Sequence, residues 1–195
     1  MSTPRSLRRI GVFCGSRPGS EPGYLELARE LGAALAARNI GLVYGGGCAG
    51  IMGAAAGAAQ QAGGEVIGVT PQGLFEDELA EVPLGRLHVV PSMHERKALM
   101  YEFSDGFITL PGGLGTLEEL LEISTWAQLG LHDKPSVVLN YSGVYDPLTQ
   151  LLDGLTARGF LPHRHRRLVR MADTVDDAIA AVEAAYAGAV SYGRT

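Results

Sequence analysis

The residues best suited to chemistry begin with a glycine-rich turn at Pro111–Thr116, which follows a short apolar run of strand composition at Phe107–Leu110. Glycine lets a backbone turn sharply and leaves room for a ligand to approach the main chain. Thr116 is placed to cap a helix that begins at Leu117, and the free N–H groups at a helix N-terminus attract anions. The stretch therefore predicts a phosphate or nucleotide pocket at the carboxyl end of a central strand.

Glu119, just beyond this turn, has two candidate roles. It lies three residues after Thr116, so the two residues match a capping box, in which the carboxylate satisfies a backbone N–H group. In the second interpretation the carboxylate points towards the sugar of a bound ligand. Spacing alone favours the capping box, because this signature commonly marks helix starts.

A second group of candidate residues opens the helix that precedes the apolar run. Ser92-x-x-Glu95 is another capping box, and Arg96 and Lys97 then share a helical face with two methionines. Such cations face either solvent or a ligand, and the pattern leaves both interpretations open because the helix has no simple polar side. His94 is expected at the surface or in the cap, since no second metal ligand stands four residues later. No metal site is predicted.

A further glycine turn matches G-x-G-x-x-G at Gly45, Gly47 and Gly50. In dinucleotide-binding proteins this pattern follows the first strand, and an acidic residue ends the next one. Here it follows the second expected strand and Glu65 begins the next, which argues against NAD. Two interpretations stay open, a turn that only packs tightly and a turn whose Gly46 and Gly47 contact the phosphate of a ligand.

Length and composition narrow the class of protein. The chain has 195 residues, which is typical of one α/β domain, and a net charge of −5, which argues against a nucleic-acid partner. Two cysteines, Cys14 and Cys48, are too few for a disulfide framework and form no C-x-x-C pair for zinc. No apolar run reaches the length of a membrane span, and the first residues lack the apolar core of a signal peptide. These features favour a cytoplasmic protein with reduced thiols.

Strand-like and helix-like patterns alternate along the chain. They predict an α/β, Rossmann-like fold with a doubly wound, mostly parallel sheet and helices on both faces in a single domain. The expected strands are 9–14, 41–44, 65–69, 87–90, 107–110, 136–139 and 168–171. The expected helices are 20–39, 51–62, one that Ser92 opens, 117–131, 144–157 and 175–186.

The sequence also gives expectations for the ends of the chain and for its loops. Residues 1–8 and 188–195 are expected to be flexible ends around a domain of residues 9–187, and the basic run at residues 163–167 is interpreted as a solvated loop. Ligands bind outside the carboxyl ends of the strands in such sheets. We therefore expect one shared pocket at the loops 15–18, 45–50, 71–78 and 111–116.

Taken together, these motifs resemble the LOG (Lonely Guy) family of cytokinin riboside 5′-monophosphate phosphoribohydrolases. The resemblance rests on the PGGxGTxxE motif that begins at Pro111 and on SMHERK at Ser92–Lys97. Five further motifs, VFCGS, LVYGGG, GxMG, VIGVTP and TWAQLGLHDKP, extend it over residues 12–16, 42–47, 50–53, 66–71 and 125–135. Such proteins have also been called lysine decarboxylases, but no Schiff-base lysine with a cofactor-phosphate site is evident around Lys97 or Lys134.

The resemblance implies cleavage of the N-glycosidic bond of an N6-prenylated adenosine monophosphate, which releases the free cytokinin base and ribose 5-phosphate. It assigns Arg96 and Glu119 as the catalytic pair, and no cofactor is expected. It also implies a homodimer or larger homo-oligomer with the active site near the interface, for which the helix containing Trp126 is our candidate. The implied substrate contacts are Glu78, Lys97, Gly112, Gly113, Leu114, Gly115, Thr116, Leu117, Glu118 and Thr125.

Two alternatives to this function stay open. A non-catalytic nucleotide-binding or carrier module would have the same glycine turns and sheet, but it would not need both Arg96 and Glu119. A broader nucleoside-monophosphate hydrolase would act on plain AMP. The chain departs from common plant members of the family at Leu114, often tyrosine there, and in the acidic connection at residues 75–81. Both departures concern the pocket rim and therefore the preferred N6 substituent.

Overall fold

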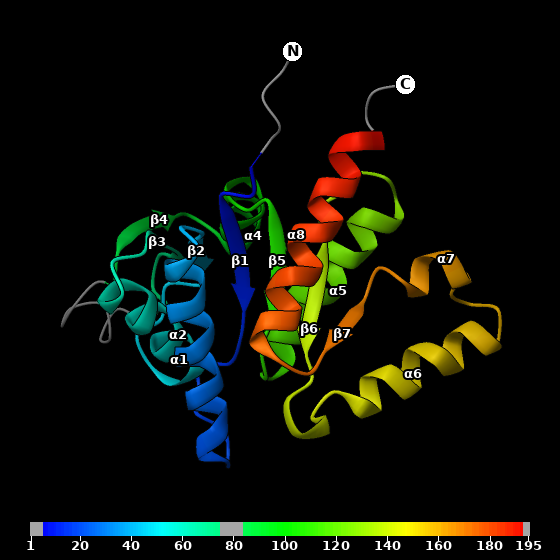
Figure 1. The fold of residues 1–195 in the computed structure, drawn as a ribbon, viewed down its shortest axis with the longest axis horizontal. Helices are drawn as coiled ribbons and strands as arrows, with labels where there is room; N and C mark the ends of the chain where they lie inside the picture. The colour runs from blue at the N-terminus through cyan, green and yellow to red at the C-terminus, as the bar shows by residue number, and fades with distance from the viewer. Residues whose placement is uncertain (1–5, 75–83, 193–195) are drawn as a thin grey trace.

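The computed structural model describes residues 6–74 and 84–192, which form an α/β fold (Figure 1). Seven strands within these residues build one sheet in the order β4-β3-β2-β1-β5-β6-β7, and every neighbouring pair is parallel. The strands are β1 (Arg9–Phe13), β2 (Gly41–Tyr44), β3 (Val66–Pro71), β4 (Arg86–Val90), β5 (Gly106–Thr109), β6 (Ser136–Leu139) and β7 (Arg170–Ala172). The prediction of a Rossmann-like, mostly parallel sheet is confirmed.

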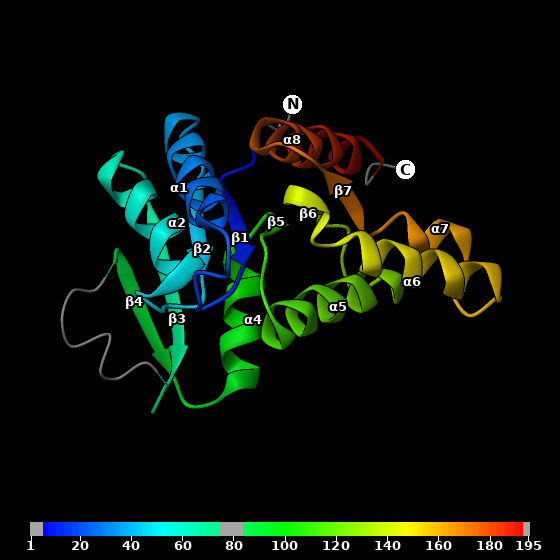
Figure 2. The ribbon, with the colours of Figure 1, turned by 90° about the horizontal axis from the view of Figure 1, so that it is seen from below.

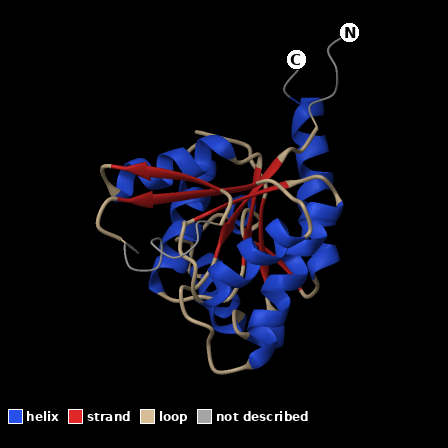
Figure 3. Cartoon of the chain, turned by 90° about the vertical axis from the view of Figure 1, so that its left-hand side faces the viewer, coloured by secondary structure: helices blue, strands red, loops and turns tan. Residues whose placement is uncertain are grey.

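Helices cover both faces of the sheet, as the alternating pattern predicted (Figure 2). One core joins α1, α2 and α8 to one face, for example through Leu31, Ala55 and Ile179, and a second core joins α4 and α5 to the other through Met100 and Ile123. Figure 3 shows the twisted sheet between these layers. The helices are α1 (Pro22–Ala37), α2 (Gly50–Gln61), α4 (Met93–Phe103), α5 (Leu114–Gln128), α6 (Asp146–Ala157), α7 (His163–Arg166) and α8 (Val175–Tyr192), with a 3-10 turn η1 (Tyr141–Gly143).

The order of the strands fixes where a ligand can enter. The chain continues from β1 to β2 on one side, whereas β5 lies on the other side of β1, so the connections after β1 and β5 diverge at their carboxyl ends. Such a switch point leaves a crevice between two loops in doubly wound sheets. The Gly15 N–H donates to the Pro111 carbonyl across this crevice over 3.1 Å. The glycine turn therefore follows a central strand, as predicted.

Several element boundaries differ from the prediction. The basic run is not a loop, because residues His163–Arg166 form the short helix α7, which is anchored by a 2.6 Å ion pair between Arg166 and Asp153. The last helix ends at Tyr192 and not at Tyr186. Residues 1–5 and 193–195 lie outside the described residues, so the expected flexibility of the chain ends stays a prediction.

Candidate active site

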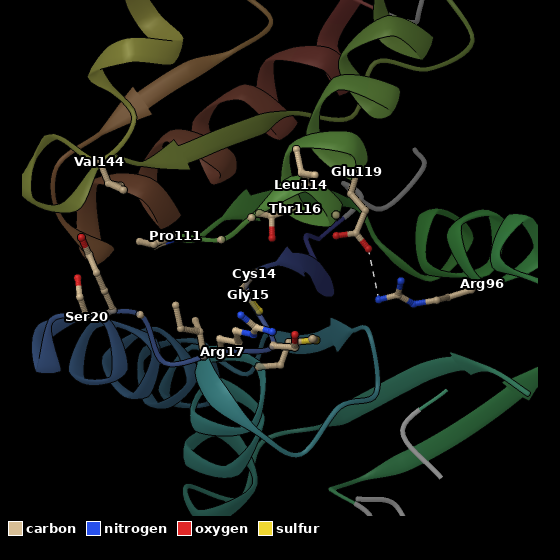
Figure 4. A pocket seen from close by; sticks show the side chains of 18 residues that line it. Cys14, Gly15, Arg17, Ser20, Arg96, Pro111, Leu114, Thr116, Glu119 and Val144 are labelled. Carbon is tan, nitrogen blue, oxygen red and sulfur yellow. Dashed lines mark ion pairs between the residues drawn. The ribbon is translucent and has the colours of Figure 1, made fainter. Parts of the chain in front are cut away.

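A cavity of about 600 Å³ opens at the switch point between the carboxyl ends of β1 and β5 (Figure 4). Its wall is formed by the loop after β1, the starts of α1 and α2, and the glycine turn with the first turn of α5. Glu119 further along α5, Arg96 of α4 and Val144 after β6 complete it. The lining residues are Cys14, Gly15, Ser16, Arg17, Gly19, Ser20, Tyr24, Ile51, Met52, Arg96, Pro111, Gly112, Gly113, Leu114, Gly115, Thr116, Glu119 and Val144.

The glycine turn reaches the cavity in a conformation that the capping-box interpretation did not foresee. The helix α5 begins at Leu114 with Gly113 as its N-cap residue, three positions before the predicted start at Leu117. Thr116 is therefore inside the first turn and buried, and the capping box of Thr116 and Glu119 is wrong. A side chain at Gly112 would lie 2.0 Å from the Thr116 hydroxyl, so the turn closes only with glycine there. The first turn of α5 therefore lines the cavity, and the N–H groups of a first helical turn have no partner within the helix.

Without a capping role, the Glu119 carboxylate meets Arg96. Its Oε1 lies 3.3 Å from Arg96 Nη2, and the two residues are only 7% and 8% exposed. The dashed line in Figure 4 marks this ion pair, which joins α5 to α4 across one end of the cavity. The Ser92 hydroxyl accepts from the Glu95 N–H at the start of α4, which confirms the predicted cap at Ser92 and sets the direction of the helix that carries Arg96.

Two contacts hold the Arg96 guanidinium in place, and a glycine leaves space for it. Its Nε donates to the Val69 carbonyl over 3.2 Å, and its Nη1 lies 3.2 Å from the Met93 sulfur. Gly45 makes room for the third nitrogen, since a Cβ there would stand 1.9 Å from Nη2. The turn of Gly45–Gly50 thus serves the cavity by giving space to Arg96.

Burial dominates the electrostatics of Glu119. Loss of water raises the pKa of this carboxyl to about 7, although the positive charge of Arg96 opposes the shift. Among the described residues, Oε1 has no hydrogen-bond partner despite being buried. A carboxyl group with a pKa near neutrality in a cavity is typical of residues that hold or exchange charge during catalysis. Burial also raises the pKa of the Cys14 thiol far above its usual range, so Cys14 contributes a neutral wall.

The structure brings together part of the set of residues that the sequence analysis singled out. Arg96 and Glu119 line the cavity with the turn residues Gly112, Gly113, Leu114, Gly115 and Thr116. Lys97 points elsewhere and forms ion pairs with Glu118 and Glu122. The Thr125 hydroxyl donates to the Leu121 carbonyl within α5, and Leu117 packs against the core near Leu120.

Three further residues that were predicted to contact the substrate either do not line the cavity or lie outside the described residues. Gly46 adopts a left-handed conformation with φ of 85° and packs near Thr70, and Gly47 is buried beside it. Glu78 lies outside the described residues. Substrate contacts by Gly46, Gly47, Glu78, Lys97, Leu117, Glu118 and Thr125 therefore stay predictions.

Several lining residues had no signal in the sequence. Arg17 and Ser20 lie in or beside the loop 15–18, which the expected fold placed at the pocket. Neither residue type at that position predicts a contact with a ligand. Val144 follows β6 and η1, and only the packing of that segment over the cavity mouth brings it there. The fold brings residues from such distant segments together, and no local sequence pattern predicts these contacts.

A doubly wound fold with a glycine turn and a buried arginine–carboxylate pair at its switch point defines a class of proteins that take small phosphate-bearing ligands. Residues 52–182 match the family model described as "Possible lysine decarboxylase". Among curated proteins, the chain is 47% identical over 176 residues to the cytokinin riboside 5′-monophosphate phosphoribohydrolase LOG of Oryza sativa subsp. japonica, covering 90% of this chain and 73% of the relative. The chain belongs to this LOG family.

Further comparisons agree with the family and the fold. The chain is 46% identical to the phosphoribohydrolase LOG3 of Arabidopsis thaliana over 176 residues, covering 90% of this chain and 82% of the relative. Among solved structures, the molybdenum cofactor carrier protein of Chlamydomonas reinhardtii superposes with a TM-score of 0.68 at 25% identity, covering 94% of this chain and 99% of that one. A molybdenum cofactor binding protein of Rippkaea orientalis shares the fold with a TM-score of 0.68 at 24% identity, covering 93% and 98%.

The described residues contain neither a cluster of metal ligands nor a helix suited to a membrane. Among them, no group of three or more His, Cys, Asp or Glu residues is arranged to hold a metal ion. Within the same residues, no helix combines the length and the apolar character needed to cross a membrane.

Proposed function

We propose that this protein hydrolyses the N-glycosidic bond of N6-prenylated adenosine 5′-monophosphates and releases the free cytokinin base and ribose 5-phosphate. One observation carries the proposal: the buried pair of Arg96 and Glu119, with Oε1 3.3 Å from Nη2, forms one end of a glycine-lined cavity. The relatives from rice and Arabidopsis are named for this reaction. Arg96 and Glu119 are the proposed catalytic residues.

The chemistry of the bond explains why a buried carboxylate is useful. As the bond between C1′ and the base lengthens, positive charge builds on the ribose ring. The ionised Glu119 carboxylate stabilises this charge and orients the attacking water, in a site where one such contact is worth about 3–4 kcal/mol. Water then adds its hydroxyl to C1′ and its proton ends on the departing base, so the reaction needs no further reactant.

Arg96 has a supporting role in this scheme. Its contacts to Val69 and Met93 fix the guanidinium, and its charge keeps Glu119 more acidic than burial alone would allow. A fixed arginine at this end of the cavity also donates to a ribose hydroxyl or to a base nitrogen. Either contact holds the substrate close to the geometry of reaction.

The glycine turn anchors the other end of the substrate. The N-terminus of α5, at Gly113 and Leu114, offers free N–H groups and the positive end of the helix dipole to the 5′-phosphate. Binding energy far from the reacting bond then positions that bond. Leu114 projects at the mouth with 87% of its surface exposed, where it meets the part of the substrate nearest to solvent.

Two other activities suggested by the comparisons fit the cavity less well. A lysine decarboxylase that works through a Schiff base requires an accessible lysine, and no lysine is among the described residues that line the cavity. A carrier for an anionic ligand, as the Chlamydomonas protein is named, gains nothing from a buried carboxylate. The buried ion pair of Glu119 with Arg96 favours catalysis over carriage.

A substrate panel tests the proposed reaction. Purified protein is incubated with isopentenyladenosine 5′-monophosphate, AMP and isopentenyladenosine, and base release is followed by chromatography. We expect release from the prenylated monophosphate, little from the nucleoside, and loss of release in Glu119→Gln, which keeps the side-chain shape and removes the charge. Glu30→Gln, on the exposed surface of α1, serves as the matched control.

The outcomes separate the candidate functions. Equal turnover of AMP would broaden the substrate class to nucleoside monophosphates. If no base is released from any compound while nucleotide binding is retained, the hydrolase proposal is wrong and a non-catalytic nucleotide-binding module is favoured. Full activity of folded Glu119→Gln would remove the carboxylate from the mechanism.

The proposal extends to assembly and compartment. Apolar side chains lie exposed along α5 and just after it, at Leu121, Leu129 and Leu131, and we propose that they form part of a homo-oligomer interface. A nucleotide substrate and a chain with two cysteines suit the cytoplasm, which is the compartment that we propose.

A further inference from the structure

Among the described residues, one cation that lines the cavity forms no ion pair. Its described lining residues include two arginines, Arg17 and Arg96, and a single acid, Glu119. Arg96 is balanced by Glu119 at 3.3 Å, whereas Arg17 forms no ion pair with the described acidic residues. The cavity therefore keeps about one net positive charge when Glu119 is ionised, and Arg17 supplies it.

The backbone that carries Arg17 is held firmly in place. The Gly15 N–H donates to the Pro111 carbonyl over 3.1 Å, and the Gly15 carbonyl accepts from the Met52 N–H over 3.2 Å. Ser16 packs so closely on Gly50 that a Cβ at Gly50 would lie 2.4 Å from its carbonyl carbon. The loop is thus attached to the glycine turn on one side and to α2 on the other, and the position of the Arg17 backbone is fixed.

This position faces the anion-binding end of the cavity. Figure 4 shows Arg17 on the side of α1 and α2, opposite Leu114 and Thr116 at the start of α5. A phosphate at the N-terminus of α5 would lie between the free N–H groups of the helix and the guanidinium of Arg17. Helix N–H groups and an arginine are complementary donors for a phosphate, because arginine binds two of its oxygens at once.

The other cations near the site are already engaged. Lys97 is paired with Glu118 and Glu122 and does not line the cavity, and Arg96 donates to Val69 and faces Glu119. A nucleoside 5′-monophosphate brings a charge of about −2. Without Arg17, the N-terminus of α5 alone would have to compensate that charge.

We infer that Arg17 binds the 5′-phosphate of the substrate and so makes the protein selective for nucleotides over nucleosides. This inference rests on the proposed function for the identity of the substrate, although phosphate recognition can be measured without catalysis. Arg17 would act on binding of the phosphate, whereas Glu119 and Arg96 act at the glycosidic bond.

Direct binding measurements test the role of Arg17. Binding of ribose 5-phosphate and of ribose is measured by calorimetry for the wild type, Arg17→Gln and Arg17→Lys. Because a hydrogen-bonded charge pair contributes to affinity, we expect Arg17→Gln to weaken binding of ribose 5-phosphate about 10- to 100-fold. Arg17→Lys keeps the charge but loses the bidentate contact, so its affinity for ribose 5-phosphate should lie between those of the wild type and Arg17→Gln. Arg29→Gln, an exposed arginine of α1 outside the cavity lining, is the matched control and should bind as the wild type does.

A kinetic comparison adds a second readout. With isopentenyladenosine 5′-monophosphate, Arg17→Gln should raise KM about 10-fold or more, and the preference for this nucleotide over isopentenyladenosine, measured as the ratio of their kcat/KM values, should fall. Wild-type affinity for ribose 5-phosphate in Arg17→Gln, or no binding by the wild type, would overturn the inference. If the wild type releases no base but binds ribose 5-phosphate through Arg17, the proposed hydrolase fails and the phosphate site stands.

Discussion

At the scale of single residues, Glu119 makes the stability of the protein depend on pH. Burial raises its pKa from 4.5 to about 7, with Arg96 opposing the shift. Between these two values the folded protein holds a proton that the unfolded chain has already released. The folded state then binds more protons, so the free energy of unfolding falls as pH rises through this window. Above pH 7 the full cost of a buried carboxylate is present.

We therefore expect Glu119→Gln to be more stable than the wild type at alkaline pH. The amide cannot ionise, so the variant should gain about 1–3 kcal/mol in the free energy of unfolding at about pH 8, and the difference should vanish near pH 4.5. Urea unfolding at several pH values measures this, with Glu30→Gln as an exposed control. If Glu119→Gln is less stable than the wild type at pH 8, the attraction between Arg96 and the ionised carboxylate exceeds the cost of burying that carboxylate, and the prediction is wrong.

At the scale of elements, the turn between β2 and α2 controls the site without lining it. Gly45 has no side chain where the Arg96 guanidinium lies, and a Cβ would stand 1.9 Å from Nη2. Arg96 is a flexible side chain, so it would move away from an added methyl group and the fold would persist. The displaced guanidinium would then lose its place beside Glu119.

Gly45→Ala should accordingly impair activity more than stability. A displacement of about 1 Å in a catalytic group costs about 100-fold in rate, so we expect kcat/KM to fall about 100-fold while the thermal midpoint changes little. Gly57→Ala in α2 is the control, because a Cβ there meets nothing within 4 Å and alanine favours the helix. Kinetics and thermal unfolding of both variants test this. Retained activity in Gly45→Ala would show that the position of Arg96 is not critical.

At the scale of the whole molecule, the exposed apolar side chains concern assembly. Leu121 in α5 is 43% exposed and Leu129, just after it, is 66% exposed, whereas Trp126 between them is half-buried against Tyr101 with ring centroids 5.5 Å apart. Trp126 therefore packs mainly within the chain. The leucines around it are better candidates for an interface between copies.

We expect the protein to sediment with at least twice the chain mass of 20.5 kDa. Leu121→Asp places a charge in the proposed interface, where an unpaired charge is costly, and should shift the protein to monomers. Leu151→Asp on α6, at another exposed leucine, is the control and should leave the mass unchanged. Analytical ultracentrifugation at several concentrations measures both. A wild type that is monomeric throughout would refute the interface.

Local patterns were sufficient to predict most of the fold. Apolar runs and helical spacing located the strands and helices, and their alternation predicted a parallel sheet with the glycine turn on a central strand. The same kind of reasoning failed at Thr116, where S/T-x-x-E spacing predicted a cap that does not exist. The spacing is identical at Ser92, where the cap forms. The two cases differ because Gly113 already supplies the N-cap backbone before Thr116, whereas no earlier residue does so for Ser92.

The sequence by itself determined the family and the layered fold, since both depend on residue types at short, regular spacings. The pairing of Arg96 with Glu119 was implied by the family resemblance and not by spacing. Only the tertiary structure decided that Glu119 turns inward to Arg96, that Gly45 makes room for the guanidinium, and that Arg17 and Val144 reach the same cavity. These decisions depend on contacts between segments that are distant in the chain. Burial and the pKa of Glu119 arise from such contacts, because they depend on which atoms replace water around the carboxylate.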